Sequence, residues 1–153
     1  MAIPLCLTLL VSSWTDWHRR KIYNKVLLPA FLIALLGRGV MQGWPGVLQG
    51  LEGAGVGLAL LFLFYQLGGI GAGDVKLLAV IGAYGGVTFV LSVFAWAALT
   101  GGLVSLLFLL RKRALVPALR HWYRLREPLH KDWTLPYGVI LSLGVVAAYA
   151  RPF

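Results

Sequence analysis

One carboxylate in this chain stands where a charged side chain is costly, which makes it the first candidate for chemistry. Asp74 lies in the glycine-rich stretch Gly68–Val80, GGIGAGDVKLLAV, between the apolar runs Leu58–Leu67 and Leu77–Ile81. An ionisable group placed between such runs marks a functional site in proteins embedded in lipid. The stretch is equally consistent with a flexible loop that ends in Asp74 as the cap of the next helix. Its four glycines would let the backbone adopt positive φ or approach another chain closely: Gly68, Gly69, Gly71 and Gly73.

Asp16, at the end of the first apolar run, is the second candidate. Two aspartates held close together cannot both ionise easily, so they share one proton. The ionised aspartate can then activate water for attack on a peptide carbonyl while the protonated one bonds the carbonyl oxygen, with no metal or cofactor. Membrane-embedded aspartates also carry protons or cations in transporters. The chemistry alone leaves open an aspartic hydrolase, a small proton- or cation-coupled transporter and a non-catalytic assembly subunit.

The composition indicates a protein embedded in lipid. Of the 153 residues, 59% are hydrophobic and 12% are charged, and the mean hydropathy is +0.82. A net charge of +9 would suggest nucleic acid as the partner of a soluble protein, but here the basic residues lie in short loops between apolar runs. We therefore expect the lipid bilayer, and no nucleic acid, as a partner. A single cysteine, Cys6, and three scattered histidines predict no internal disulfide and no metal site.

The predicted fold class is all-α: residues 1–153 form one polytopic membrane domain with about six transmembrane helices. A helix that crosses the hydrocarbon core of a bilayer needs about 20 apolar residues. The two shortest predicted spans, the first and the fourth, suggest that the membrane is locally thinned where they meet. The first span is interpreted as a retained helix because no basic segment precedes it. The spans are Met1–Trp14, Val26–Gln42, Val47–Leu67, Val75–Tyr84, Val87–Leu110 and Leu135–Ala150.

The basic residues predict the orientation in the membrane. All 14 Lys and Arg residues except Arg38 and Arg151 lie in the first and fifth loops between the predicted spans or, in the case of Lys76, at the edge of the third loop. Short loops rich in Lys and Arg stay on the cytoplasmic side, so both termini are predicted to face outward. Asp16 and Asp74 then come to the same, cytoplasmic face, although neither residue entered the count.

Three other features are assigned structural roles. Loop 111–133 is predicted to be an amphipathic cytoplasmic helix on the membrane surface, either as an anchor on anionic lipid or in direct contact with substrate. Glu52 is predicted to be a polar residue satisfied by a partner such as Arg38, not a catalytic group. Glycines at spacings of three and four residues in the third span predict a smooth stripe for close helix packing: Gly46, Gly50, Gly53 and Gly57.

Three segments together carry a resemblance to a known family. The segment Gly71–Lys76, GAGDVK, resembles the GxGD(x)K motif of the type IV prepilin peptidases, which are membrane aspartyl proteases. The segment Asp16–Asn24, DWHRRKIYN, is similar to that family's first catalytic aspartate and the basic stretch after it. Leu135–Gly138, LPYG, resembles the Pro-Tyr-Gly before its last helix. The three segments occur in the family order and span essentially the whole chain.

The resemblance implies that Asp16 and Asp74 are the catalytic pair and that Gly71, Gly73 and Lys76 support the motif. Lys76 would either tune the pair by its charge or anchor a helix end. The implied activity is that of an aspartic endopeptidase in the bacterial inner membrane, which removes the short basic leader from prepilin or pseudopilin substrates at the cytoplasmic face. The chain has no paired cysteines, so it resembles the short form without a zinc-binding and methyltransferase segment, and no cofactor is expected.

Overall fold

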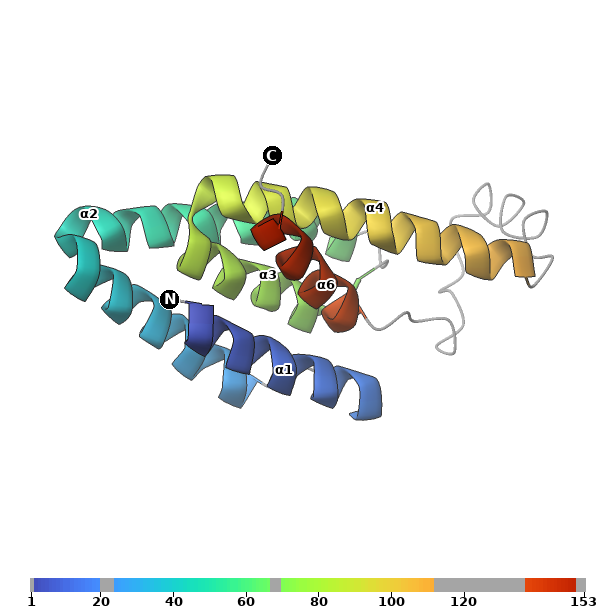
Figure 1. The fold of residues 1–153 in the computed structure, drawn as a ribbon, viewed down its shortest axis with the longest axis horizontal. Helices are drawn as coiled ribbons and strands as arrows, with labels where there is room; N and C mark the ends of the chain where they lie inside the picture. Colours follow the sequence, from blue (N-terminus) through green and yellow to red (C-terminus); the bar gives the residue numbers. More distant parts are fainter. Residues whose placement is uncertain (1, 20–23, 67–69, 112–136, 151–153) are drawn as a thin grey trace.

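The chain forms five helices in the part that the computed structural model describes, which is residues 2–19, 24–66, 70–111 and 137–150. No strand occurs in these ranges, which confirms the predicted all-α class. The predicted surface helix in loop 111–133 lies, after Arg111, outside the described residues. Figure 1 shows α3 in the middle of the bundle, α2 bent into a V, and α1 along one edge. The helices are α1 (Ala2–Arg19), α2 (Asn24–Gln66), α3 (Ala72–Gly85), α4 (Val87–Arg111) and α6 (Tyr137–Ala150).

The second and third predicted spans lie on the two arms of α2, which are two helical segments joined at a sharp kink, and the kink falls in the predicted gap between Gln42 and Val47. The bend lies at Gly43, where φ is 68° and ψ is −156°. Residues with a Cβ rarely adopt this backbone conformation, whereas glycine does so without steric cost. Pro45 follows inside the helix, and its missing N–H removes one helical hydrogen bond next to the bend. The six predicted apolar runs thus lie on five helices.

Two predicted span boundaries differ from the helix ends in the structure. α1 continues to Arg19, well past the predicted end at Trp14, because no glycine or proline interrupts it there. α3 begins at Ala72 instead of Val75, with Gly71 as its N-cap. The predicted division between the fourth and fifth spans is confirmed, because Gly86, with φ at 80°, separates α3 from α4.

α3 is the central helix of the bundle because it is apolar on nearly every face. Of its residues between Asp74 and Tyr84, all except Lys76 are buried. A helix that is hydrophobic all round must be covered on every side, and the second arm of α2, α4 and α6 all pack against α3. Asp74 therefore lies at one end of the most buried element in the described structure.

The predicted glycine stripe on α2 packs against the backbone of α3, which confirms its structural role. A Cβ on Gly53 would overlap the carbonyl oxygen of Gly82, and a Cβ on Gly57 would lie 2.7 Å from the carbonyl oxygen of Leu78. The two helices can approach this closely only because these positions carry no side chain. The contact fixes α3, and with it Asp74, against the second arm of α2.

We expect Gly82→Ala to destabilise the protein by about 1–3 kcal/mol, the typical cost of forcing extra atoms into a packed core. The new Cβ would overlap the backbone of Gly53, so α2 and α3 would have to separate. The thermal unfolding midpoint in detergent measures the effect. Gly55→Ala is the matched control, since a Cβ at Gly55 meets nothing within 4 Å and should be neutral or stabilising. Equal midpoints for the two variants would contradict the close crossing.

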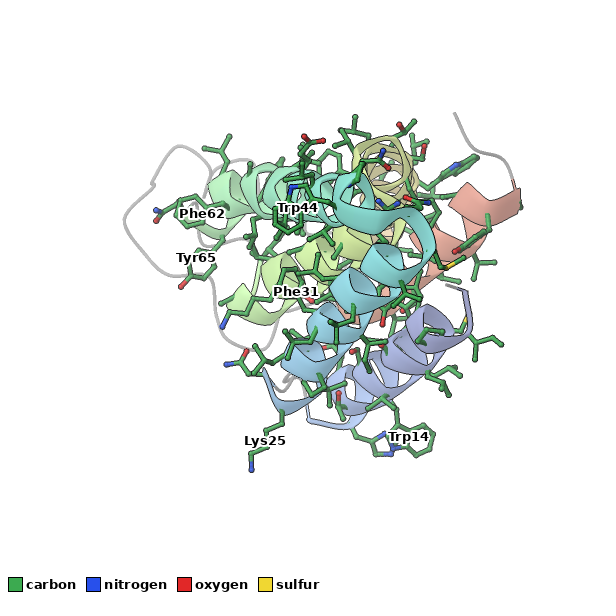
Figure 2. The ribbon with its side chains drawn as sticks, turned by 90° about the vertical axis from the view of Figure 1, so that its left-hand side faces the viewer. Trp14, Lys25, Phe31, Trp44, Phe62 and Tyr65 are labelled. Carbon is green, nitrogen blue, oxygen red and sulfur yellow. The ribbon has the colours of Figure 1, made fainter. Side chains whose placement is uncertain are left out.

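The outside of the described bundle is apolar, as in a protein that faces lipid. Large hydrophobic side chains are exposed on every long helix, far more than a soluble surface carries. Two segments of the described residues are long and apolar enough to cross a membrane, α2 and residues Val87–Val104 of α4. Figure 2 shows Trp14 and Lys25 pointing outward from α1 and α2, whereas Phe31 lies among the helices.

Candidate active site

Asp16 is held by the first turn of α6. Its side chain is buried, with 8% of its surface exposed, and its Oδ2 accepts a hydrogen bond of 2.9 Å from the backbone N–H of Gly138. Gly138 is the second residue of α6, and the first N–H groups of a helix have no partner within the helix. Such a helix end also favours a negative charge. The contact therefore fixes the position of Asp16.

The missing side chain of Gly138 makes room for the carboxylate of Asp16. A Cβ at Gly138 would lie 2.8 Å from Oδ2 and 3.3 Å from Cγ of Asp16, so any larger residue would push the carboxylate away. A second pair of side chains holds the same two helices together, because the hydroxyl oxygens of Ser13 and Ser142 lie 2.6 Å apart. The start of α6 is thus docked on α1 at the level of the carboxylate.

Asp74 has a different environment. It is the third residue of α3, and its N–H donates to the carbonyl oxygen of the N-cap residue Gly71 at 3.1 Å. Its side chain is 9% exposed, and Oδ1 is buried and has no hydrogen-bond partner among the described residues. Asp74 precedes the predicted span Val75–Tyr84. Burial, and second the charge of Asp16, raise the pKa of Asp74 above that of a free aspartate, and a hydrogen bond from the backbone of Gly71 opposes the shift.

The structure thus brings Asp16 and Asp74 into electrostatic contact, although they come from helices far apart in the sequence. One carboxylate is held by a helix N-terminus, and the other is buried with a raised pKa. Environments that separate two carboxyl groups in this way let one act as base and the other as acid at the same pH. The described residues contain no cluster of three or more His, Cys, Asp or Glu residues that could hold a metal ion.

The other residues of the GAGDVK motif have positions that differ in part from the expectation. Gly71 has φ at −76°, and Gly73 lies inside α3, so neither glycine uses the positive φ that its missing side chain permits. Asp74 is not the helix cap either, since Gly71 has that position. A Cβ at Gly71 would lie 3.2 Å from Oδ2 of Asp74, so this glycine gives the carboxylate room.

Lys76 is exposed and donates a hydrogen bond of 3.1 Å to Oδ1 of Asn24, the first residue of α2. The bond ties the start of α3 to the start of α2, and it tests neither of the two roles expected for Lys76. The sequence placed both residues in motifs but did not connect them.

The suggested partnership between Glu52 and Arg38 is wrong. Arg38 is buried and donates to the carbonyl oxygen of Tyr84 at 3.2 Å and to Oε1 of Gln49 at 3.4 Å. Glu52 is exposed. One bond of the guanidinium thus goes to the carboxyl end of α3, where helix carbonyls are free and a positive charge is favoured.

The contact between Gly138 and Asp16 was not predicted from the sequence. Leu135–Gly138 was recognised only as a family motif before a helix. The usable signal is the combination of a helix start with a glycine in its first turn, since such a turn offers free N–H groups to an acidic side chain without a Cβ in the way.

Comparison with known proteins places the chain in a family. The type IV leader peptidase family matches residues 3–106, a range that includes Asp16 and Asp74. The prepilin leader peptidase/N-methyltransferase of Bacillus subtilis (strain 168) is 29% identical over 150 residues, which are 97% of this chain and 54% of that protein. The chain therefore spans about half the length of this relative. No solved structure matches the chain. Since the family match covers more than half of the sequence, the chain belongs to the type IV leader peptidase family.

Proposed function

We propose that the chain is an aspartic endopeptidase that removes the short basic leader from prepilin-like or pseudopilin substrates at the cytoplasmic face of the bacterial inner membrane. The observation that carries the proposal is the buried pair Asp16 and Asp74, each in a different environment. Family membership and the relative in Bacillus subtilis, a prepilin leader peptidase/N-methyltransferase, support the same class of substrate.

The two environments assign the roles within the pair. Asp16, held by the N–H of Gly138 at the start of α6, is the base that takes a proton from water. Asp74, whose raised pKa keeps it protonated, is the acid that donates to the carbonyl oxygen of the substrate. Its buried and unpartnered Oδ1 is an oxygen that can reach a substrate or water without breaking an existing bond.

The proton transfers return the pair to its starting state in one cycle. The oxygen of water bonds to the carbonyl carbon, the proton of water passes to Asp16, and Asp74 protonates the carbonyl oxygen. When the tetrahedral intermediate collapses, the C–N bond breaks and Asp16 gives its proton to the leaving nitrogen. Asp74 takes a proton back from a hydroxyl group of the intermediate. One water is consumed for each peptide bond, and no covalent enzyme intermediate forms.

We further propose that the five helices cross the membrane six times, with the bent helix α2 crossing twice. The site would then lie at the cytoplasmic interface, on the same side of the membrane as Trp14 and Lys25, whose side chains point outward (Figure 2). Tryptophan is enriched at membrane interfaces, and lysine in cytoplasmic loops. Lys25→Cys in a Cys6→Ala background should react with impermeant thiol reagents only from the cytoplasmic side, and reaction from the outer side would refute this orientation.

The function is tested with purified chain in proteoliposomes that contain a tagged prepilin. Wild-type chain should shorten the substrate by its leader, and a metal chelator should not prevent the cleavage, because a carboxylate pair activates water unaided. The new N-terminus should carry no added methyl group. If the substrate stays intact in the presence of folded wild-type chain, the peptidase function is refuted. Proton flux across the membranes of the same vesicles would then support the transporter.

Cleavage is expected to be lost as the pH rises through the raised pKa of Asp74, because the acid then loses its proton. The alkaline limb of kcat/KM should lie well above the value of about 3.9 for a free aspartate. The acidic and alkaline limbs of the pH profile report apparent pKa values of the coupled pair, not of single residues. Lys76→Ala should leave the profile unchanged, since this lysine is exposed and bonded to Asn24. An alkaline limb near the free-aspartate value would contradict the assignment of Asp74.

A further inference from the structure

Three buried side-chain oxygens in the described part of the chain have no hydrogen-bond partner. They are Oγ of Ser12, Oδ1 of Asp74 and the hydroxyl of Tyr84. Ser12 is 1% exposed and Tyr84 is 4% exposed, so bulk water does not reach either in this conformation. Buried polar atoms in folded proteins almost always have a partner, and a segment surrounded by lipid has no outside water to provide one.

The three oxygens belong to α1 and α3, and the boundary between these two helices is called the seam. On α1, the side chains of Thr8, Ser12 and Asp16 are buried and follow one another at four-residue intervals, which places them on one face of the helix. On α3, Asp74 interacts with Asp16, and Tyr84 interacts with Thr8 without reaching hydrogen-bond geometry. The two ends of α3 therefore lie opposite the two ends of this face.

The helix geometry agrees with this alignment. α1 and α3 run in opposite directions (Figure 1), and the rise of ~1.5 Å per residue separates Thr8 from Asp16 by ~12 Å and Asp74 from Tyr84 by ~15 Å. The hydroxyl of Thr8 donates to the carbonyl oxygen of Pro4 at 2.8 Å, which leaves its lone pairs able to accept. Polar side chains thus recur at intervals of about 6 Å along α1 between the levels of Tyr84 and the aspartate pair.

We propose that this seam holds a file of water molecules between Tyr84 and the pair Asp16 and Asp74, bound by the side chains of Thr8, Ser12 and Tyr84. Each buried water makes about three hydrogen bonds to polar groups that would otherwise be unsatisfied. Where the proposed peptidase function holds, the file delivers the one water molecule that each cleavage consumes. Delivery from the Tyr84 end leaves the opposite, cytoplasmic end of the pair open to the substrate.

Deuterium exchange at introduced thiols tests the water file without any substrate. In a Cys6→Ala background, the thiols of Thr8→Cys and Ser12→Cys should exchange their proton in D2O, followed by the infrared S–H stretch, at least about tenfold faster than those of Leu9→Cys and Leu5→Cys, because a buried thiol exchanges only where water molecules reach it. The pairs are matched in burial, since Thr8 and Leu9 are 7% and 6% exposed and Ser12 and Leu5 are 1% and 0% exposed. Equal rates within the matched pairs would show a dry seam and overturn the proposal.

Two substitutions of nearly equal shape test what the file does. Ser12→Val and Ser12→Thr add similar volume, but only threonine keeps the hydroxyl. Ser12→Val should lower kcat by about tenfold or more with little change in KM, and Ser12→Thr should retain most of it, because misplacing a reactant costs rate more than binding. An equal loss of kcat in both variants would reduce Ser12 to a packing role. Fast exchange at the thiols of Thr8→Cys and Ser12→Cys, in a protein whose Cys6→Ala parent never cleaves prepilin, would refute the proposed function but still support the water file.

Discussion

Asp16→Asn and Asp74→Asn are each expected to lower prepilin cleavage by several orders of magnitude while the protein remains folded. An amide can neither take a proton from water nor share one with its partner, so either substitution removes one half of the acid–base pair. Asparagine keeps the shape of aspartate, and at position 16 it can still accept the hydrogen bond from Gly138. The single-turnover rate of cleavage in proteoliposomes measures the loss.

The stability of the same variants separates catalysis from folding. The folded-state pKa of Asp74 is raised, so its contribution to stability is full below about pH 3.9, the unfolded value, and is lost as the pH rises through the folded value. Asp74→Asn should therefore unfold at the same or a higher temperature than the wild type at neutral pH. Glu52→Gln is the control for activity. Glu52 is exposed, so this variant should cleave prepilin at the normal rate. Normal cleavage by Asp16→Asn together with loss in Glu52→Gln would mean that the partner of Asp74 is misassigned.

Gly138→Ala is expected to lower the cleavage rate by about 100-fold or more, since a displacement of about 1 Å in a catalytic group can have such an effect. The new Cβ would lie 2.8 Å from Oδ2 of Asp16 and would force the carboxylate off the N–H that holds it. The loss should appear in kcat more than in KM, because the substitution moves a reacting group. Cleavage assays over a range of prepilin concentrations measure both constants.

Gly102→Ala is the matched control for Gly138→Ala. Both are helical glycines, but a Cβ at Gly102 meets nothing within 4 Å, so cleavage should be unchanged. A wild-type rate for Gly138→Ala would show that Asp16 does not depend on the start of α6, and it would remove the reason for naming Asp16 as the base.

The proximity of Asp16 and Asp74 could be anticipated from the sequence because the distribution of Lys and Arg predicts which ends of the spans share a face. The hydrogen-bond partner of Asp16 could not be anticipated from the sequence. It is the main-chain N–H of Gly138, and a backbone donor leaves no trace in the residue type. The suggested partner of Arg38 was wrong for a related reason, since Arg38 donates to carbonyl oxygens of Tyr84 and Gly46 and to the side chain of Gln49, and not to the acidic residue that charge alone suggested.

The bend in α2 shows a different limit. Gly43 and Pro45 are typical of a turn between two helices, and they are equally typical of a kink within one. Hydrophobic periodicity identifies each arm of α2 but carries no information about the angle between the arms. The packing of Gly53 against Gly82, which is a tertiary contact, fixes where the second arm lies.

The bond between Asp16 and Gly138 also bears on when the protein becomes active during synthesis. The two residues are 122 positions apart, so the carboxylate of the first helix waits for the start of the last described one. A nascent chain that already contains Asp16 and Asp74 still lacks the group that orients Asp16. Contacts between such distant positions form late, since they close a long loop. The ribosome must therefore pass Gly138 before the catalytic geometry can exist, and partly synthesised chains should have both aspartates and no peptidase activity.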